Sequence, residues 1–314
     1  MPRSSHPPQA RQWFFLLCAL SAALLLLRPA PAMEAVREAL RLCSETIVPS
    51  LFPFLVFSAL LTALLPTAAL DRALSPLMRP IFRLSGDCGA VLALGFAGGY
   101  PVGVRTTAAL YRQGTLRRSE AQRLLAFCNN SGPGFFLGVC GTAVFGSARA
   151  GAYLYLIHVG AALVTGVLLR RNLGLPRRKA VSRQRAPFDL AAALPAAVQS
   201  SFAAVGSVSA FVIFFMVLLR LLSLMPALAA LPPLPRAALF GFVEMTNGVN
   251  ALPATRAGFV LCAAIMNWGG LSVQAQTRAL LAGSALSARR CVIGKAVQAL
   301  AGVPLALLAA QRLF

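Results

Sequence analysis

The sequence LLAFCNNSGPGFFLG, residues 124–138, interrupts an apolar run with two asparagines, a serine and a Gly-Pro-Gly segment. The apolar flanks favour a helix, whereas Gly-Pro-Gly breaks one. A break at membrane depth exposes backbone amides and carbonyls, and each of these costs several kcal/mol when it has no hydrogen-bonding partner. The stretch therefore predicts a discontinuous helix that faces protein or a water-lined cavity.

The composition places this break in a membrane protein. Of the 314 residues 58% are hydrophobic and 12% are charged, and apolar blocks such as 13–27 and 47–65 recur along the chain. Such blocks suit helices that cross a hydrocarbon layer of roughly 30 Å. A transmembrane β-barrel would instead show short segments of alternating polarity. The sequence predicts an all-α, polytopic helical membrane protein.

The basic residues follow the loops between the apolar blocks. The 29 Lys and Arg residues exceed the eight acids and give a net charge of +21. Seven positive charges and no acid lie between Arg170 and Arg185, which predicts a cytoplasmic loop under the positive-inside rule. Most phenylalanines lie within the apolar blocks and are not interleaved with arginine. This pattern argues against a nucleic-acid partner.

The sequence carries no recognisable catalytic or metal-binding motif. It lacks GxGxxG, GxxxxGK[ST] and GxSxG, and its seven scattered cysteines form no CxxC pair. We therefore expect no enzymatic activity, no metal and no cofactor. His158 lies in an apolar span, where we interpret it as a helix-packing residue, with a proton relay as the alternative.

The chain divides into four expected parts. Residues 1–46 are predicted to hold an N-terminal membrane span and an amphipathic segment, residues 47–170 a first repeat, residues 171–194 a basic cytoplasmic linker, and residues 195–314 a second repeat. Ala-Pro-Ala at residues 30–32 resembles a signal-peptidase site, but further spans follow at once, so we expect the first span to be retained.

The two repeats share short motifs in the same order. GFAGGYPVG from Gly95 is similar to GFVEMTNGV from Gly241, and AFCNNSGP from Ala126 is similar to AIMNWGGL from Ala264. If the glycine-marked segments 88–112 and 237–256 enter and leave the membrane on one side, each half has an odd number of crossings and the halves are inverted.

The distribution of charge favours this inverted arrangement. It places the basic loops 66–87, 105–123, 170–185 and 284–295 in the cytoplasm. The alternative, in which the glycine-marked segments cross fully, puts Arg289, Arg290 and Lys295 outside. The prediction is two inverted repeats, each with a re-entrant hairpin and a broken helix.

Glu244 is the strongest single candidate for function, because it is the only acid after Asp189 and lies in an apolar segment. An intramembrane carboxylate is energetically costly, and it can bind a cation, carry a proton or accept a hydrogen bond from a solute hydroxyl. The alternative is a carboxylate at the aqueous interface that caps a helix or pairs with Arg256.

Polar residues beside the breaks complete the predicted substrate site. Their alternative role is helix–helix hydrogen bonding for the asparagines and a flexible turn for GGYPVG. The predicted substrate-binding residues are Tyr100, Asn129, Asn130, Ser131, Gly132, Glu244, Thr246, Asn247 and Asn267.

Several of these motifs together resemble a known family. They are PSLFPFLVFSALL from Pro49, GGYPVG from Gly98, LYRQG from Leu110, LLAFCNNSGPGF from Leu124 and GFVEMTNG from Gly241. Residues 45–310 are similar to the YlbJ-type sporulation integral membrane proteins, which carry paired gate, or nucleoside-recognition, domains. The resemblance implies a bacterial cytoplasmic or forespore membrane and a fold related to concentrative nucleoside transporters. Gly98-Gly99 occupies the place of Glu244-Met245, so one half alone offers a carboxylate.

Two functions are compatible with these features. The first is a sporulation-associated carrier or channel for a small polar solute, nucleoside-like or another metabolite. The alternative is a non-transporting membrane assembly factor in spore envelope or cortex formation. The expected partners are the lipid bilayer, the solute, and either a second copy of the chain or a sporulation membrane protein.

Overall fold

The computed structural model describes residues 25–64, 67–170 and 189–314, together with residues 12, 15, 16, 19, 22 and 23. Every regular element in these ranges is a helix, as the sequence predicts. Seven residues of the predicted first span, 13–27, and residues 171–188 of the basic linker lie outside the described residues.

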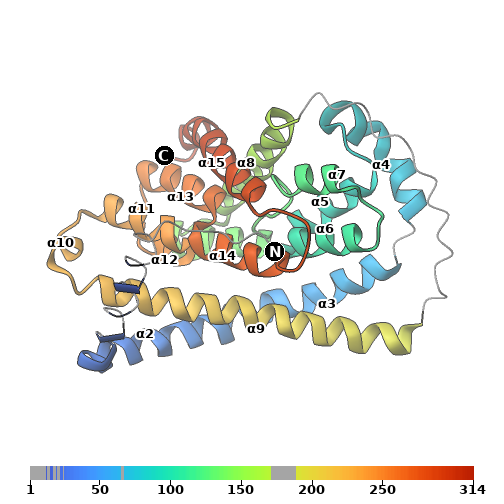
Figure 1. The fold of residues 1–314 in the computed structure, drawn as a ribbon. Helices are drawn as coiled ribbons and strands as arrows, with labels where there is room; N and C mark the ends of the chain where they lie inside the picture. Colours follow the sequence, from blue (N-terminus) through green and yellow to red (C-terminus); the bar gives the residue numbers. More distant parts are fainter. Residues whose placement is uncertain are drawn as a thin grey trace.

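Two long helical rods run along one side of the molecule (Figure 1). The first consists of α2 (Pro29–Leu42), the π-helical turn η1 (Cys43–Ile47) and α3 (Val48–Leu64), which follow one another directly. The second rod is α9 (Leu190–Leu222). The predicted amphipathic stretch at residues 34–46 thus continues into the next span. The wide turn of η1 ends just before Pro49, which has no amide hydrogen to donate.

The other helices form a body beside these rods. In the first half they are α4 (Thr67–Phe82), α5 (Asp87–Gly98), α6 (Val102–Arg112), α7 (Arg118–Leu124), the π-helix η2 (Phe135–Val144) and α8 (Ala148–Leu168). In the second half they are α10 (Pro226–Ala229), α11 (Pro233–Val243), α12 (Met245–Asn250), α13 (Arg256–Trp268), α14 (Gly270–Leu281) and α15 (Arg289–Ala310).

Helices in the described ranges are long and apolar enough to span a bilayer. Four meet this condition, namely α8, α9, α13 with α14, and α15, and the pair α4–α5, bent by 87°, makes a fifth if it is counted as one broken span. Large apolar side chains point outward from the rods and from α15, where they contact lipid. They include Phe57, Phe202, Phe214, Leu300 and Leu308.

The chain leaves helical geometry at each predicted interruption. The hairpin α5–α6 turns at Gly99–Pro101, and the hairpin α11–α12 turns at Glu244. Between α7 and η2 the chain runs through turns and an extended stretch at residues 125–132. Gly269, with a φ of 81°, separates α13 from α14, a backbone conformation that favours glycine.

Basic loops from both halves meet at one end of the molecule. Arg118 donates from Nε to the carbonyl of Ala285 at 3.0 Å, and Arg170 donates from Nη1 to the carbonyl of Ile81 at 3.1 Å. The predicted cytoplasmic loops therefore lie on the same side of the body. This holds for 66–87, 105–123 and 284–295, and for Arg170, with which the fourth loop begins.

The extended stretch 125–132 packs directly against two helices through glycine. A Cβ atom at Gly294 in α15 would overlap the carbonyl of Ala126, and one at Gly103 in α6 would overlap the carbonyl of Cys128. Because the overlapping atoms are backbone, no side-chain rotation can make room. These two glycines therefore determine how closely residues 125–132 approach α6 and α15.

We predict that Gly294→Ala lowers the free energy of unfolding by about 3 kcal/mol, because the loop must move away from α15. Gly206→Ala is the matched control, since no atom lies within 4 Å of a Cβ built at that position. Unfolding of the purified protein in mixed micelles, followed by circular dichroism, measures both variants. Equal stability of the two variants would contradict the packing described here.

Candidate functional site

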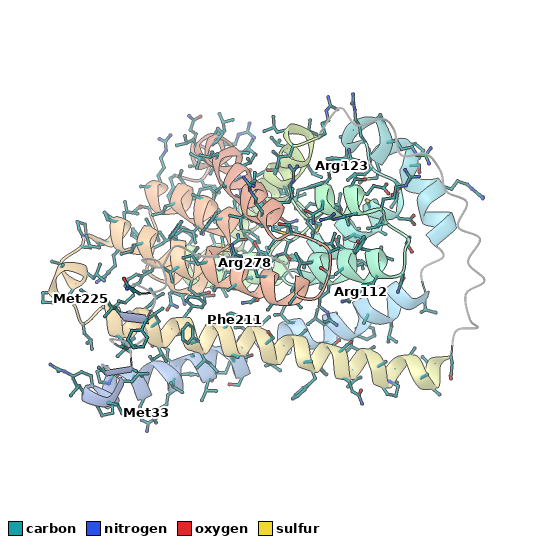
Figure 2. The ribbon with its side chains drawn as sticks, viewed as in Figure 1. Met33, Arg112, Arg123, Phe211, Met225 and Arg278 are labelled. Carbon is teal, nitrogen blue, oxygen red and sulfur yellow. The ribbon has the colours of Figure 1, made fainter. Side chains whose placement is uncertain are left out.

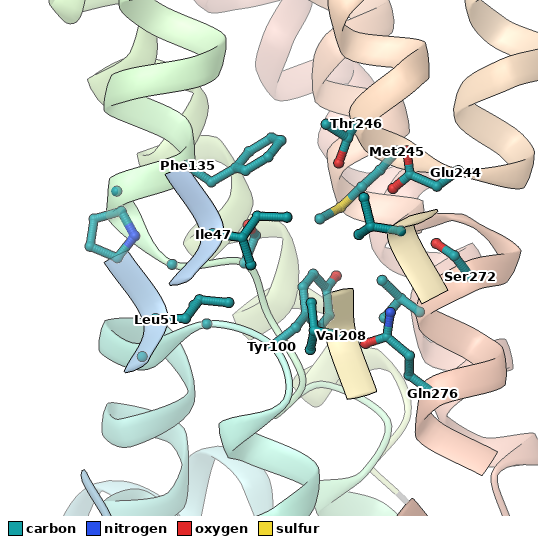
Figure 3. A pocket seen from close by; sticks show the side chains of 18 of the residues that line it. Ile47, Leu51, Tyr100, Phe135, Val208, Glu244, Met245, Thr246, Ser272 and Gln276 are labelled. Carbon is teal, nitrogen blue, oxygen red and sulfur yellow. The ribbon is translucent and has the colours of Figure 1, made fainter. Parts of the chain in front are cut away.

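The turns of both hairpins line a single cavity of about 360 Å³ between the body and the rods (Figure 3). The first half contributes the α5–α6 turn and residues 131–135, and the second half contributes the α11–α12 turn and the first part of α14. Ile47, Leu51, Val208 and Val212 of the rods close it with apolar side chains. The cavity therefore has a polar wall from the breaks and an apolar wall from the rods.

Glu244 is buried at the tip of the second hairpin and lines the cavity. One carboxylate oxygen, Oε2, accepts from the backbone N–H of Asn247 at 2.8 Å and from its side-chain Nδ2 at 3.0 Å. Glu244 thus caps α12, and within the described residues it forms no ion pair, with Arg256 or any other cation. Asn247 lies outside the cavity lining and acts by positioning the carboxylate.

Tyr100 lies at the tip of the first hairpin, and Figure 3 shows it lining the same cavity as Glu244 and Thr246. Its side chain is buried, and its hydroxyl has no hydrogen-bonding partner among the described residues. A Cβ atom at Gly269 would lie 2.8 Å from this hydroxyl oxygen. Tyr100 of the first half therefore approaches the break of the second half while keeping one donor free.

The structure brings five of the nine predicted substrate-binding residues to the cavity. They are Tyr100, Ser131, Gly132, Glu244 and Thr246. Ser272 and Gln276 of α14 also line it and were not predicted, because sequence periodicity alone did not indicate which face of α14 points to the cavity.

Asn129, Asn130 and Asn267, which were predicted to bind substrate, lie outside the cavity lining. All three are buried, and each side-chain NH2 group donates to the protein, whereas Oδ1 of Asn129 has no partner among the described residues. Asn129 donates from Nδ2 to Oγ1 of Thr277 at 3.1 Å, whereas Asn130 and Asn267 each donate to a carbonyl of the preceding turn at 2.8 Å. These bonds fit the alternative role, hydrogen bonding within the protein, and substrate binding by the three asparagines stays a prediction.

Gln298 of α15 joins the two breaks. Its Nε2 atom lies 3.1 Å from Oδ1 of Asn130 and 3.0 Å from Oδ1 of Asn267. The first asparagine belongs to the break of the first half and the second to that of the second half. One amide nitrogen therefore binds both interruptions, and a buried polar group of this kind holds its neighbours in one arrangement.

His158 makes a second link between the breaks. The backbone N–H of Ser131 donates to Nε2 of His158 at 3.1 Å, so this nitrogen carries no proton. The Nδ1 atom then carries the proton and donates to Oδ1 of Asn267 at 2.9 Å. The imidazole is thus held as one neutral tautomer, which agrees with a structural role in packing.

Lys295 is a buried residue beside the cavity wall whose place the sequence prediction missed. It was counted with the basic loop 284–295, but it lies within α15 and is only 2% exposed. Its Nζ atom donates to Oε1 of Gln298 at 2.9 Å and to Oδ1 of Asn130 at 3.2 Å, and it lies 5.2 Å from the ring centroid of Tyr100. Lys and Gln three residues apart in an apolar helix were the available signal.

The bonding network defined by Asn130, His158, Asn267, Lys295 and Gln298 lies behind Tyr100 and Ser131, on the far side of the cavity wall. Among the described residues no three His, Cys, Asp or Glu side chains come together as ligands for a metal ion. The cavity itself offers hydroxyls, one amide and one carboxylate, which are groups that bind a hydroxylated solute.

Comparison with known proteins agrees with the resemblance found in the sequence motifs. Residues 45–153 match the Gate family, described as nucleoside recognition. The chain is 29% identical over 305 residues to the sporulation integral membrane protein YlbJ of Bacillus subtilis strain 168, an alignment that covers 85% of this chain and 74% of the relative. No solved structure matches the chain. The predicted resemblance is confirmed: the chain is a multi-pass integral membrane homologue of YlbJ with a Gate domain.

We predict that Gln298→Leu lowers the free energy of unfolding by about 3 kcal/mol, because it leaves Lys295 with one hydrogen-bond acceptor and separates the two breaks. Gln311→Leu, at an exposed position near the end of α15, is the control for the same chemical change. Unfolding in mixed micelles measures both. If Gln298→Leu were as stable as the control, the network would not hold the breaks together.

Proposed function

We propose that this protein is a sporulation-associated carrier for a small hydroxylated solute of the nucleoside type, which it binds in the cavity and moves across the bacterial cell or forespore membrane without chemical conversion. The observation that carries the proposal is that Tyr100 and Glu244 line the same cavity. These residues form the tips of two hairpins from different halves, and both line one enclosed space. Broken helices from two halves that meet around a site are the recurrent design of secondary carriers.

The chemistry of the cavity supports a neutral or cationic solute with hydroxyl groups. Glu244 presents a carboxylate oriented by Asn247 and Thr246, and Tyr100 has a hydroxyl without a described partner. Ser131, Thr246 and Gln276 add further donors and acceptors. A volume of about 360 Å³ lies in the range of roughly 300–1,000 Å³ typical of small-molecule sites.

We further propose that residues 47–170 and 195–314 are inverted repeats related to those of concentrative nucleoside transporters. The contact of Arg118 with Ala285 supports this topology, because it requires the loops at 105–123 and 284–295 to lie on one side of the membrane. Full crossings by the hairpins would place these loops on opposite sides. The shared side is also the more basic one, as the positive-inside rule requires of the cytoplasm.

The seam between the rods and the body offers a route to the cavity. Larger apolar cores lie within the body, whereas the seam is packed by one small cluster around Leu55, Val102 and Val205. Sliding of the body along α3 and α9 would open the cavity first to one side and then to the other without separating the two breaks, because the bonding network keeps them together.

Transport by purified protein in liposomes tests the proposal, with labelled uridine and adenosine as the first solutes. We predict that Glu244→Gln lowers initial uptake at least about tenfold and Tyr100→Phe about fivefold, since each removes one polar contact with the solute. Tyr153→Phe is the matched control, because it removes a tyrosine hydroxyl outside the cavity lining.

Two results would contradict the carrier. One is the absence of uptake above protein-free liposomes for these solutes and for a wider panel of hydroxylated metabolites. The other is an equal effect of Tyr100→Phe and Tyr153→Phe. Either result would favour the alternative, a non-transporting assembly factor in the spore envelope, which photo-crosslinking in sporulating cells would then detect through a protein partner.

The inverted topology has its own test. In a background without the seven native cysteines, single cysteines at Thr115, Pro232 and Ser287 are exposed to a membrane-impermeant maleimide. We predict that position 232 labels from outside and that positions 115 and 287 label only from the cytoplasmic side. Labelling of position 287 from outside would show that the halves are parallel, whatever the outcome of the transport assay.

A further inference from the structure

A second cavity, of about 450 Å³, lies between α3, α6 and α14. It shares α3 and α14 with the first cavity but lies further from the hairpin tips: Leu55 of α3 comes one turn after Leu51, and Ala279 of α14 comes one turn after Gln276. Figure 2 shows Arg112 where α6 approaches α3, at the edge of this region. The carrier proposal assigns no function to this second cavity.

Two arginines of α6 give the second cavity its charge. Arg105 and Arg112 both line it, and seven residues correspond to about two helical turns, so they lie on one face roughly 10 Å apart along the axis. Arg105 is partly buried, yet neither guanidinium has a hydrogen bond or an ion pair with another described residue. No carboxylate is among the residues that line the cavity.

The rest of the lining is mostly apolar, with Leu55 and Ala59 on α3 and Leu280 on α14. The cavity thus combines two unpaired cations with an apolar wall, which suits an organic anion. A carboxylate offers two acceptor oxygens and one negative charge, whereas a phosphoryl group offers three oxygens and up to two charges, and so matches two guanidinium groups in both number and charge. The geometry therefore favours a phosphoryl group over a carboxylate.

We infer that this cavity binds a phosphate ester, with its phosphoryl group between Arg105 and Arg112 and its apolar part against Leu55, Ala59 and Leu280. The inference does not depend on transport. The ester can reach the cavity from the bilayer, as the headgroup of an anionic lipid, or from solution, as a small phosphorylated metabolite. Both sources share the chemistry that the two guanidiniums recognise.

Binding is measured as a saturable rise in melting temperature of the purified protein in a neutral detergent. The lipid probe is phosphatidic acid, compared with diacylglycerol, and the soluble probe is hexyl phosphate, compared with hexanol. Each comparison differs only in the phosphoryl group. We expect a rise of about 3 °C with at least one of the two phosphate esters and none with its phosphate-free counterpart.

The variants decide whether the arginines are responsible. Arg112→Gln, which changes an exposed side chain and should not affect folding, is expected to weaken binding about tenfold, and Arg105→Gln at least as much. Arg278→Gln is the control, because it removes an exposed charge from α14 beside the cavity without changing its lining. It should bind like the unaltered chain.

The outcomes separate the sources and the alternatives. A response to phosphatidic acid alone assigns the cavity to a lipid headgroup, and a response to hexyl phosphate assigns it to phosphate esters in general. The inference is overturned if neither ester stabilises the protein more than its phosphate-free counterpart, or if Arg112→Gln and Arg278→Gln respond alike. Since no solute flux is measured, failure here leaves the carrier proposal untouched.

Discussion

Backbone groups that leave a helix inside a bilayer must find partners within the protein, and this requirement organises the structure. The chain is interrupted at residues 125–132 and again at Gly269, and both interruptions end on the same amide group of Gln298. His158 adds a second bridge through Ser131 and Asn267. Two segments that would each be costly alone are stable because they satisfy one another through α8 and α15.

The loop between α7 and η2 contributes residues to both the bonding network and the cavity. Asn130 points away from the cavity into the bonding network, while Ser131 and Gly132 line the cavity. Tyr100 lies between these regions: it lines the cavity, its ring is near Lys295, and its buried hydroxyl approaches Gly269. A solute bound there would meet polar groups held in place from behind, which is the preorganisation that a selective binding site needs.

Sequence reasoning located the elements better than the side-chain roles. The breaks and the hairpin turns follow from where Gly and Pro interrupt apolar runs, and the burial of Glu244 follows from its place as a lone acid in such a run. The sequence does not predict that Asn130 and Asn267 point into the protein core. Near a break, a shift of one residue along the chain turns a side chain from the cavity to the core, and the sequence does not fix that shift. Lys295 was missed for a related reason: it follows two loop arginines, and burial depends on which face of α15 it occupies.

The shared construction of the cavity bears on how such a fold can arise. The match to the Gate family covers residues 45–153, which contain Tyr100 and Ser131 but neither Glu244 nor Gln298. Half of the wall and the amide that closes the network are therefore supplied by the remainder of the chain. A polypeptide with the Gate region alone would have an open half-site, and a second copy related to it by twofold symmetry is the arrangement that would close it. Gene duplication and fusion would then have joined two associated copies into one chain.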